Sequence, residues 1–337
     1  MLNHEEVFSI ALIGGDGIGP EVVAEALKVL KAAGLKLDVT EFDLGADRFL
    51  RDGEILGNET FEKLRLHDAI LFGAVGSPLV NPGILERGII LKIRFGFDLY
   101  INYRPCNGIA PGKTQLHDFV VIRENTEGPY AGEGGSLREG TRFEVATQGS
   151  INTAVGVERC IRFAFEVAMS RPRRHLTLVH KTNILQYSGR LWNRIFVQLA
   201  QEFPLVETAY NHVDAACIYL VQDPQRYDVI VTDNLFGDIL TDLAGAVSGG
   251  IGLSASANLN PSRTSPSFFE PVHGSAPDIA GTGRANPVGA ILSAGLMADF
   301  LGAHEVSKQI KTACENAGSG TTSEIGDRIA ARVAASR

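Results

Sequence analysis

The chain has 337 residues, of which 45% are hydrophobic and 21% are charged, so it has ample material for a packed core and a length typical of two domains. Its formal net charge is −8 and no basic run is longer than Arg171–Arg174, which excludes an extended nucleic-acid-binding surface. No apolar run reaches the length of a membrane-spanning helix, so we expect no membrane partner.

The start of the chain and its cysteines both favour a cytoplasmic protein. Met1–Glu6 is polar and acidic, unlike the basic region and apolar stretch of a secretion signal. Four cysteines are scattered without the paired spacing of a metal finger or a disulfide framework. They are Cys106, Cys160, Cys217 and Cys314.

Short apolar runs alternate with helical patterns along the chain. Such alternation predicts an α/β architecture with a largely parallel sheet, in which ligands gather beyond the carboxyl ends of the strands. The predicted strands are Val7–Ile13, Asp68–Phe72, Asp118–Ile122, Leu176–Val179 and Tyr227–Thr232. The predicted helices include Glu21–Ala33, Val155–Met169 and Ser323–Ala335, the last with Ser323 as N-cap.

The glycine-rich segment Gly14–Pro20 follows the first predicted strand. Its spacing is GxGxG, whereas a dinucleotide-binding fingerprint has GxGxxG. A tight strand-to-helix turn with Pro20 near the first helical position explains the segment equally well. We therefore assign no cofactor to it.

Several cationic side chains and one phenol follow predicted strands or turns. Arg94, Arg104 and Arg123 suit a dicarboxylate substrate if they converge, and are otherwise surface or structural ion-pair residues. Tyr130 is either an acid or a packing residue. Lys181 directly follows an apolar strand, where a low-dielectric environment can depress the pKa of a lysine and make it a base.

An acidic pair gives the most specific chemical hypothesis. Asp238 and Asp242 lie one turn apart on a predicted helix, where like charges are unfavourable unless a cation offsets them. A divalent ion held by carboxylate oxygens fits, with Asp214 as a third ligand. The alternative is two solvated acids on a surface helix. Asp233 precedes the motif and has no assigned role.

The segment Glu270–Gly281 has the composition of a ligand-binding loop. Its prolines, glycines and small residues let backbone approach a ligand closely. His273 and Asp278 are its polar side chains. An acid at such a position can bind the 2′-hydroxyl of an adenosine ribose and repels the 2′-phosphate of NADP.

Taken together, these segments resemble the β-decarboxylating dehydrogenase family of isopropylmalate and isocitrate dehydrogenases. The resemblance extends over nearly the whole chain and keeps the family order of motifs. It covers Gly14–Pro20, Arg94, Asn102–Pro105, Arg123–Gly128 with Tyr130, His180–Asn183, Asp214, Asn234–Asp242 and Glu270–Asn286.

The resemblance implies a two-lobed α/β fold with a mixed sheet, which is not the Rossmann fold. Residues 1–98 and 250–337 are expected to form a cofactor-binding lobe, and residues 99–249 a substrate-binding and dimerisation lobe. The active site is expected in the cleft between them. The family is dimeric, and the resemblance implies that each active site takes Lys181, Asn183 and Asp214 from the neighbouring subunit.

The resemblance also implies the cofactors and the roles of the site residues. Mg²⁺ or Mn²⁺ is expected on Asp214, Asp238 and Asp242, with Lys181 and Tyr130 as the proton-transferring residues. NAD is preferred because Asp278-Ile279 stands where NADP-using isocitrate dehydrogenases have Lys-Tyr. The expected NAD contacts are Glu270, His273, Gly274, Ser275, Ala276, Asp278, Ile279 and Asn286.

The same resemblance indicates the substrate. Arg94, Arg104 and Arg123 would bind the malate carboxylates, while Ile90, Leu91 and Ile184 would line an apolar pocket with Asn183 and Asp214 nearby. An apolar wall suits the isopropyl group of 3-isopropylmalate, an intermediate of leucine biosynthesis, and leaves an isocitrate carboxylate unpaired.

Alternatives stay open at this stage. Tyr103 stands where the family usually has leucine, so a tartrate, homoisocitrate or other alkylmalate dehydrogenase is an alternative in the same reaction class. A non-catalytic regulatory subunit is an alternative from another class. A Mg²⁺-dependent phosphotransferase is disfavoured because the sequence has no GxxxxGK[ST] loop.

Overall fold

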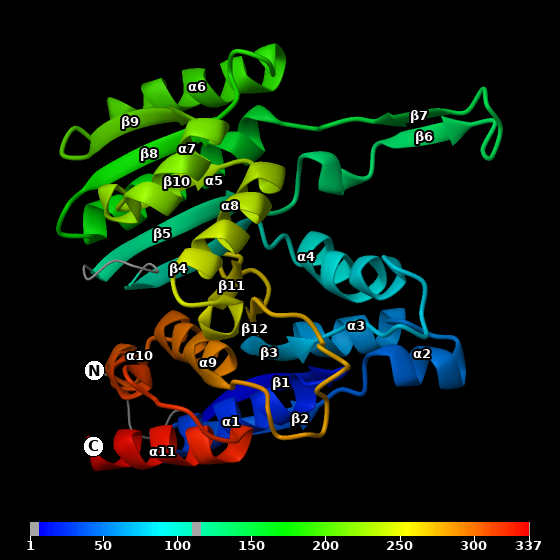
Figure 1. The fold of residues 1–337 in the computed structure, drawn as a ribbon, viewed down its shortest axis with the longest axis vertical. Helices are drawn as coiled ribbons and strands as arrows, with labels where there is room; N and C mark the ends of the chain where they lie inside the picture. The colour runs from blue at the N-terminus through cyan, green and yellow to red at the C-terminus, as the bar shows by residue number, and fades with distance from the viewer. Residues whose placement is uncertain (1–6, 110–115, 337) are drawn as a thin grey trace. The chain divides into compact units, whose positions relative to one another are not determined.

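A computed structural model describes residues 7–109 and 116–336 of the chain, so the initial peptide Met1–Glu6 lies outside the described residues. The chain divides into two compact units (Figure 1). The first combines Met1–Leu99 with Gly250–Arg337, and the second is Tyr100–Gly249. No helix among the described residues is both long enough and apolar enough to cross a membrane.

The first unit contains a mixed sheet of strand order β2-β1-β3-β12-β11. Neighbouring strands are parallel except β11, which is antiparallel to β12. The strands are β1 Val7–Gly15, β2 Lys36–Glu41, β3 Ala69–Ala74, β11 Ala255–Leu259 and β12 Ser267–Pro271. The helices are α1 Gly19–Ala32, α2 Ala46–Asp52, α3 Asn58–Arg65, α4 Lys92–Gly96, α9 Val288–Phe300, α10 His304–Cys314 and α11 Thr322–Ala335, and a π-helical turn, η1 Glu86–Leu91, precedes α4.

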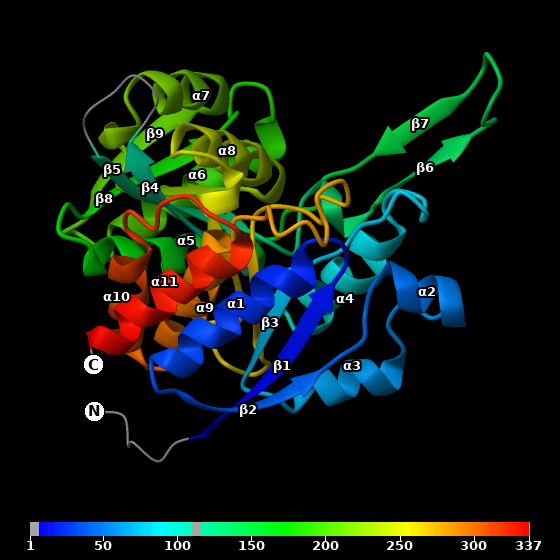
Figure 2. The same ribbon diagram turned by 60° about the horizontal axis from the view of Figure 1, so that its bottom comes forward.

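Helices cover this sheet on both faces, as Figure 2 shows for α1, α9 and α11 on one side and α3 and α4 on the other. The continuous burial of β3 reflects this two-sided cover. On the α3 side, Phe72 and Phe268 from the strands pack in one core with Phe61 and Phe97. This core fixes the helix that carries Arg94.

The second unit also has a mixed sheet, of strand order β4-β5-β10-β8-β9. Only β4 is antiparallel to its neighbour, so the prediction of a largely parallel sheet is confirmed. The strands are β4 Ile101–Ile109, β5 Leu116–Glu124, β8 His175–His180, β9 Glu207–His212 and β10 Val229–Thr232. The helices are α5 Ala154–Ser170, α6 Gln186–Ala200, α7 Val213–Gln222 and α8 Asn234–Val247, with 3-10 turns at Pro129–Ala131, Pro224–Arg226 and, in the first unit, Ile251–Leu253.

In the second unit α5 and α6 pack on one face of the sheet, and α7 and α8 on the other. A two-stranded hairpin, β6 Gly134–Leu137 with β7 Val145–Gln148, extends from this unit (Figure 1). Every residue of its two strands is exposed, including the apolar Leu137 and Val145. An isolated hairpin of this size is marginally stable in water.

One local prediction is wrong. The last helix is capped by Thr321 and not by Ser323, because Thr321 is the last extended residue before the helix. Its hydroxyl accepts a hydrogen bond from the Glu324 amide, and the Glu324 carboxylate accepts one from the Thr321 amide. This reciprocal capping box satisfies the amides of Thr321 and Glu324. It explains why the helix begins at Thr322, one residue earlier than expected.

Candidate active site

The acidic helix is well defined in the structure. Helix α8 begins at Asn234, directly after β10, and Oδ1 of Asp233 accepts a hydrogen bond from the Phe236 amide at 2.8 Å. Asp233 is therefore the N-cap of the helix, a role that the sequence analysis missed. Asp238 and Asp242 follow on the same helix, so their predicted spacing of one turn is confirmed.

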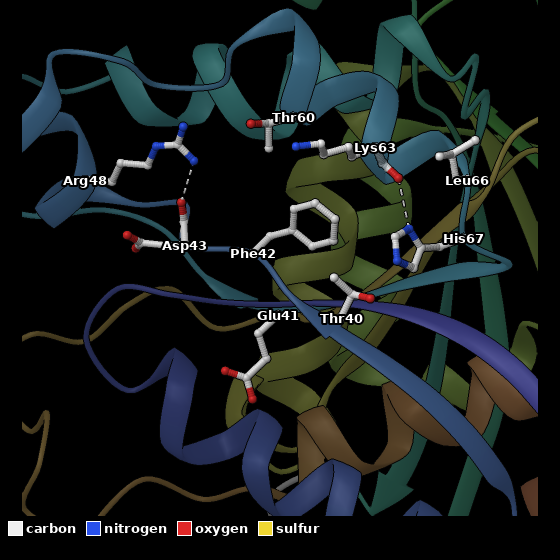
Figure 3. Close-up of a pocket in the computed structure, with 9 residues that line it drawn as sticks. All are labelled: Thr40, Glu41, Phe42, Asp43, Arg48, Thr60, Lys63, Leu66 and His67. Atoms are coloured by element: carbon white, nitrogen blue, oxygen red, sulfur yellow. Dashed lines mark hydrogen bonds between the residues drawn. The ribbon is translucent and has the colours of Figure 1, made fainter.

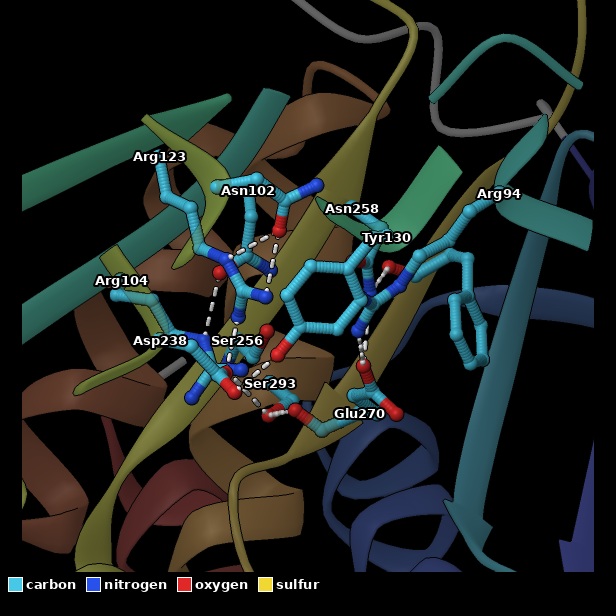
Figure 4. A network of polar contacts seen from close by, with 12 residues as sticks. Arg94, Asn102, Arg104, Arg123, Tyr130, Asp238, Ser256, Asn258, Glu270 and Ser293 are labelled. Carbon is cyan, nitrogen blue, oxygen red and sulfur yellow. Dashed lines mark hydrogen bonds and ion pairs between the residues drawn. The ribbon is translucent and has the colours of Figure 1, made fainter. Parts of the chain in front are cut away.

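Asp238 brings together two of the predicted site residues (Figure 4). One of its oxygens pairs with Nη1 of Arg123, and the other accepts a hydrogen bond from the Tyr130 hydroxyl at 2.6 Å. The Arg123 guanidinium also lies 5.2 Å from the centroid of the Tyr130 ring. A cation, a phenol and a carboxylate of the second unit are thus in direct contact.

Arg123 is held in place from a second side. Its side chain is only 1% exposed, and Oδ1 of Asn234 accepts from its Nε and Nη2 at 3.0 and 2.7 Å. A Cβ on Gly237 would lie 2.4 Å from Cγ of Arg123, so glycine makes room for the arginine. Burying a guanidinium is costly unless it is paired and hydrogen-bonded. Asn234 is thus a functional residue that residue-type reasoning did not single out.

Titration shifts around α8 have two causes, burial and the neighbouring charges. Partial burial and the hydrogen bond to Asp238 raise the pKa of Tyr130. Partial burial, followed by the negative charge of Asp238, raises the pKa of Asp242. A bound cation would relieve both effects on Asp242.

Arg104 lies on β4 of the same unit and is buried. Its Nε donates to Oδ1 of Asn102 at 2.8 Å. The burial of Arg104 and Arg123 is inconsistent with a position on the surface, whereas the alternative of a structural ion pair stays open for Arg123, which pairs with Asp238. Tyr103, between Asn102 and Arg104, is paired with Ile122 on β5 and is half-buried.

Lys181 and Asp214 form an ion pair of 2.7 Å. Lys181 follows β8, and Asp214 lies in the first turn of α7 after the neighbouring strand β9. The lysine lowers the pKa of Asp214. Asn183 and Ile184, in the turn after Lys181, are exposed, and 67% of Ile184 is accessible within one chain.

Arg94 is placed in the first unit by α4. It is buried, and its Nη2 lies 3.3 Å from Oε1 of Glu270 at the end of β12 (Figure 4). The same Glu270 oxygen accepts from Nδ2 of Asn258 at 2.9 Å, and the Glu270 carbonyl accepts from the Ser293 hydroxyl at 2.8 Å. Glu270, predicted as a cofactor contact, thus also anchors the predicted substrate arginine.

The π-helical turn η1 determines which side chains accompany Arg94. A turn of about 4.4 residues places residues four apart in line along the helix. Leu85, Ile89 and Ile93 accordingly all point into the core and are buried. Ile90 is half-buried and lies four residues before Arg94, and Leu91 is the next residue. Gly88 is required here because a Cβ would lie 2.5 Å from Cγ2 of Ile55.

The predicted cofactor loop connects β12 to α9. Asp278 is exposed, whereas Ser275 is buried and its carbonyl accepts from the Ile18 amide at 2.8 Å. A Cβ on Gly17 would lie 1.9 Å from that carbonyl, so the glycine-rich turn packs tightly against the loop. Asn286 accepts from the Val288 amide at the start of α9. The loop residues thus lie together, with His273, Gly274, Ala276 and Ile279 between them.

Within the described residues no three His, Cys, Asp or Glu side chains converge to hold a metal ion. Asp238 and Asp242 share one helix, and Asp214 is paired with Lys181 instead.

A pocket of about 410 Å³ lies elsewhere, between β2, α2 and α3 (Figure 3). None of the predicted site residues lines it. Its two cationic side chains form ion pairs, Arg48 with Glu54 and Lys63 with Glu59. The pocket supplies no reactive group for the chemistry considered above.

Comparison with known proteins places this geometry among dehydrogenases. The isocitrate/isopropylmalate dehydrogenase family model matches residues 9–328. A 3-isopropylmalate dehydrogenase of Corynebacterium aurimucosum is 57% identical over 97% of this chain and 99% of its own length. One of Thermobifida fusca is 54% identical, over 96% of this chain and 97% of its own length.

Solved structures agree. The isocitrate dehydrogenase of Methylococcus capsulatus superposes with a TM-score of 0.89 at 35% identity, covering 97% of this chain and 99% of its own. A β-decarboxylating dehydrogenase of Thermococcus kodakarensis gives a TM-score of 0.80 at 37% identity, covering 97% of this chain and 96% of its own. The predicted fold is confirmed.

Proposed function

This chain belongs to the isocitrate/isopropylmalate dehydrogenase family, and we propose that it catalyses the NAD- and metal-dependent oxidative decarboxylation of 3-isopropylmalate to 4-methyl-2-oxopentanoate. The step belongs to leucine biosynthesis, and we infer a cytoplasmic location for it. The observation that carries the proposal is the grouping of Arg123, Tyr130 and Asp238. The Asp238 carboxylate is a hard metal ligand. It contacts a cation that can bind carboxylates, Arg123, and a protonated acid, Tyr130.

The residues present fit a divalent metal ion. Asp238 and Asp242 offer carboxylate oxygens one turn apart. Burial and, after it, the negative charge of Asp238 raise the pKa of Asp242, and a bound cation would favour the charged carboxylate. Asp214, exposed in its own chain, would complete the site from a neighbouring subunit. Bound Mg²⁺ or Mn²⁺ would supply a Lewis acid that favours ionisation of the substrate hydroxyl and stabilises developing negative charge.

The loop after β12 fits NAD. Nε2 of His273 is buried and has no hydrogen-bond partner among the described residues, so a polar group of a ligand would satisfy it. The exposed Asp278 suits a ribose 2′-hydroxyl and disfavours a 2′-phosphate. Bound NAD would supply the hydride acceptor. We assign Glu270, Gly274, Ser275, Ala276, Ile279 and Asn286 to the same site.

Substrate recognition divides between cations and apolar side chains. Arg94 of the first unit and Arg104 and Arg123 of the second bind the two malate carboxylates. Each arginine is buried and held by a polar neighbour, so little side-chain freedom is lost when substrate binds. The alkyl group contacts Ile90 and Leu91, with Asn183 and Ile184 supplied by the second subunit.

Two residues move protons. Lys181 in its neutral form would accept the proton of the substrate hydroxyl as hydride leaves the same carbon. Loss of CO₂ from the resulting β-keto acid leaves an enolate, and Tyr130 delivers a proton to its carbon. A phenol is protonated at neutral pH, and the raised pKa of Tyr130 extends this state to higher pH.

The exposed apolar surfaces of the second unit support a homodimer. The hairpin β6–β7 has no cover within its own chain, and the helices α7 and α8 expose Ile218, Val221 and Ile239. A second copy that buries both surfaces would stabilise them, because such exposed apolar patches mark interfaces. The same contact would deliver Lys181, Asn183 and Asp214 to the neighbouring active site.

The decisive experiment is a substrate panel with the purified full-length protein. 3-Isopropylmalate, isocitrate, homoisocitrate, tartrate and malate are each assayed with NAD and NADP in the presence of Mn²⁺. The highest kcat/KM is expected for 3-isopropylmalate with NAD. Faster turnover of isocitrate would reverse the substrate assignment, and inactivity on every substrate would reject the enzyme itself.

A further inference from the structure

The hydroxyl of Tyr210 makes several polar contacts, and the proposed function gives it no role. It lies 3.1 Å from the amide nitrogen and 2.9 Å from Oγ1 of Thr182, 3.2 Å from the carbonyl oxygen of His180, and 2.8 Å from Nδ1 of His212. His180 and Thr182 flank Lys181 on both sides. His212 stands two residues before Asp214.

The strand register explains how one side chain reaches both segments. Strands β8 and β9 are parallel, with His180 opposite His212. Tyr210 and His212 are two residues apart on β9 and share one face of the sheet, where their rings meet edge to face at 5.1 Å. The phenol extends past the end of β8 to the turn that contains Lys181.

The donor and acceptor capacity of the phenol limits how many of these contacts are hydrogen bonds at one time. A phenol has one proton and two acceptor positions, so at most three of the four contacts are hydrogen bonds at once. The Thr182 amide can only donate, and the His180 carbonyl can only accept. These two fix the phenol between the residues before and after Lys181, and one position remains for Thr182 Oγ1 or His212.

The Lys181 turn is also closed from within. The Lys181 carbonyl accepts from the amides of Ile184 and Leu185 at 3.1 and 2.8 Å. The backbone of the turn is thus held by hydrogen bonds to the Lys181 carbonyl and by hydrogen bonds to the Tyr210 hydroxyl. The lysine side chain is flexible, so a fixed backbone restricts where its amine lies relative to Asp214.

We propose that Tyr210 is a positioning residue that holds the turn of Lys181 and the start of α7 in register, and so sets the geometry of the Lys181–Asp214 pair. This inference rests on the proposed function, because it assigns the pair to proton transfer and metal binding. Tyr210 itself touches no substrate. Its loss would misplace the base without removing it, which slows the chemical step more than it weakens binding.

Tyr227→Phe is a matched control for Tyr210→Phe. Tyr227 is a buried tyrosine of the same unit whose hydroxyl donates to Oδ1 of Asn211, the residue next to Tyr210, at 2.9 Å. Among the described residues, its hydroxyl makes no hydrogen bond to the Lys181 turn. Both variants remove one hydroxyl from a hydrogen bond to the β9 region and keep the ring.

The first measurement is steady-state kinetics of the full-length holoenzyme with 3-isopropylmalate, NAD and Mn²⁺. Tyr210→Phe should lower kcat by about tenfold or more with both KM values within about twofold, and should raise the isotope effect on hydride transfer from 2-deuterated substrate. Tyr227→Phe should leave kcat within about twofold of the parent. Equal kinetics of the two variants would overturn the proposal.

The second measurement does not depend on activity. An amine-reactive reagent is applied to the metal-free protein, and the modification rate of Lys181 is followed by peptide mass spectrometry. The rate should change in Tyr210→Phe and stay at the parental value in Tyr227→Phe. If the parent is inactive on every substrate, the proposed function fails, while this rate still decides whether Tyr210 positions Lys181.

Substitutions of Thr182 test the same contact if Tyr210→Phe folds poorly. Thr182→Val removes Oγ1 at constant shape, and Thr182→Ser keeps the hydroxyl. We expect lower kcat for the valine variant and near-parental kcat for the serine variant. In the Tyr210→Phe/Thr182→Val double variant the two losses should not add, because they act on the same contact. Full additivity would contradict the proposal.

Discussion

The hydroxyl of Tyr130 lies 2.6 Å from Oδ2 of Asp238, while the other oxygen of that carboxylate pairs with Arg123. The proposed acid, metal ligand and substrate-binding cation therefore have fixed relative positions before any ligand arrives. Such fixed positions reduce the reorganisation that the reaction requires. The predictions below examine this arrangement and the surfaces around it.

Replacing Tyr130 with phenylalanine should slow turnover by about 10²-fold or more, because the enolate loses its proton donor. The KM for 3-isopropylmalate should change little, since the arginines remain. Steady-state kinetics measures both values. Tyr100→Phe is the control, because the Tyr100 ring packs 4.1 Å from the Arg159 guanidinium in the same unit. A Tyr130→Phe enzyme as active as this control would remove Tyr130 from the mechanism.

Shared active sites can be tested with mixed dimers of two inactive variants. Lys181→Ala and Tyr130→Phe chains should each be inactive alone, since each lacks one proton-transferring residue. After subunit exchange at equal amounts, about a quarter of the parental activity should return, because half of the dimers hold one intact site of two. Exchange is verified by mass spectrometry with one labelled chain. Exchange without recovery would show that both residues serve the same chain.

The NAD preference should reverse on substitution of two loop residues. Asp278→Lys with Ile279→Tyr replaces a repulsive carboxylate with a cation and an aromatic ring that can bind a 2′-phosphate. The ratio of kcat/KM for NADP to that for NAD should rise by about 10²-fold or more. Glu207→Lys, an exposed acid of the other unit, makes an equal charge change and should leave the ratio unaltered.

The alkyl pocket should be sensitive to truncation of its apolar wall. Ile90→Ala or Leu91→Ala should lower kcat/KM for 3-isopropylmalate by about 10- to 100-fold, the effect of about 1–3 kcal/mol of lost apolar contact. Unsubstituted malate should be affected far less, because it has no alkyl group to lose contact. Ile84→Ala, which precedes the π-helical turn and packs on the same core, is the control. Equal losses on both substrates would indicate general damage.

Stability should fall in mild acid through a buried histidine. Burial lowers the pKa of His117, whose Nε2 lies 2.8 Å from the Ser248 hydroxyl. In the unfolded chain the pKa is about 6.5, so below that pH the unfolded state binds a proton that the folded state refuses. The stabilisation is therefore complete above the unfolded pKa and is lost as pH falls towards the folded pKa.

The measurement compares melting temperatures at about pH 7.5 and pH 5.5. The His117→Gln variant should lose less stability between these values than the parent, even if it starts lower. His304→Gln, at an exposed histidine, should follow the parent. A His117→Gln variant with the full parental pH dependence would refute this source of acid sensitivity.

Local patterns in the sequence predicted the features that depend on spacing along one element. The helix of Asp238 and Asp242 and the place of Lys181 after a strand both follow from such patterns. Contacts between distant segments were not predictable. Tyr210 contacts Thr182, 28 positions earlier in the chain, only because β8 pairs with β9, and Asn234 contacts Arg123 only because β5 pairs with β10.

The π-helical turn was missed for a different reason. The run Ile89–Leu91 is apolar at every position, so it fits an α-helix and a π-helix equally well. Similarly, Thr321 and Ser323 are both acceptable caps by residue type, and only the backbone conformation distinguishes them. The pairing of Arg94 with Glu270, far apart in the chain, likewise appears only in the folded unit.

The π-helical turn Glu86–Leu91 also affects how positions are transferred between relatives. It holds one residue more than an α-helical turn of the same height, and Arg94 lies beyond it on an ordinary helix. A relative with a plain α-helix here would be one residue shorter, yet its arginine would align without a visible mismatch. Numbering carried backwards from that arginine would then be shifted by one residue on the N-terminal side of the inserted position. Alignments of this segment should place the gap inside Glu86–Leu91 before any pocket residue is compared.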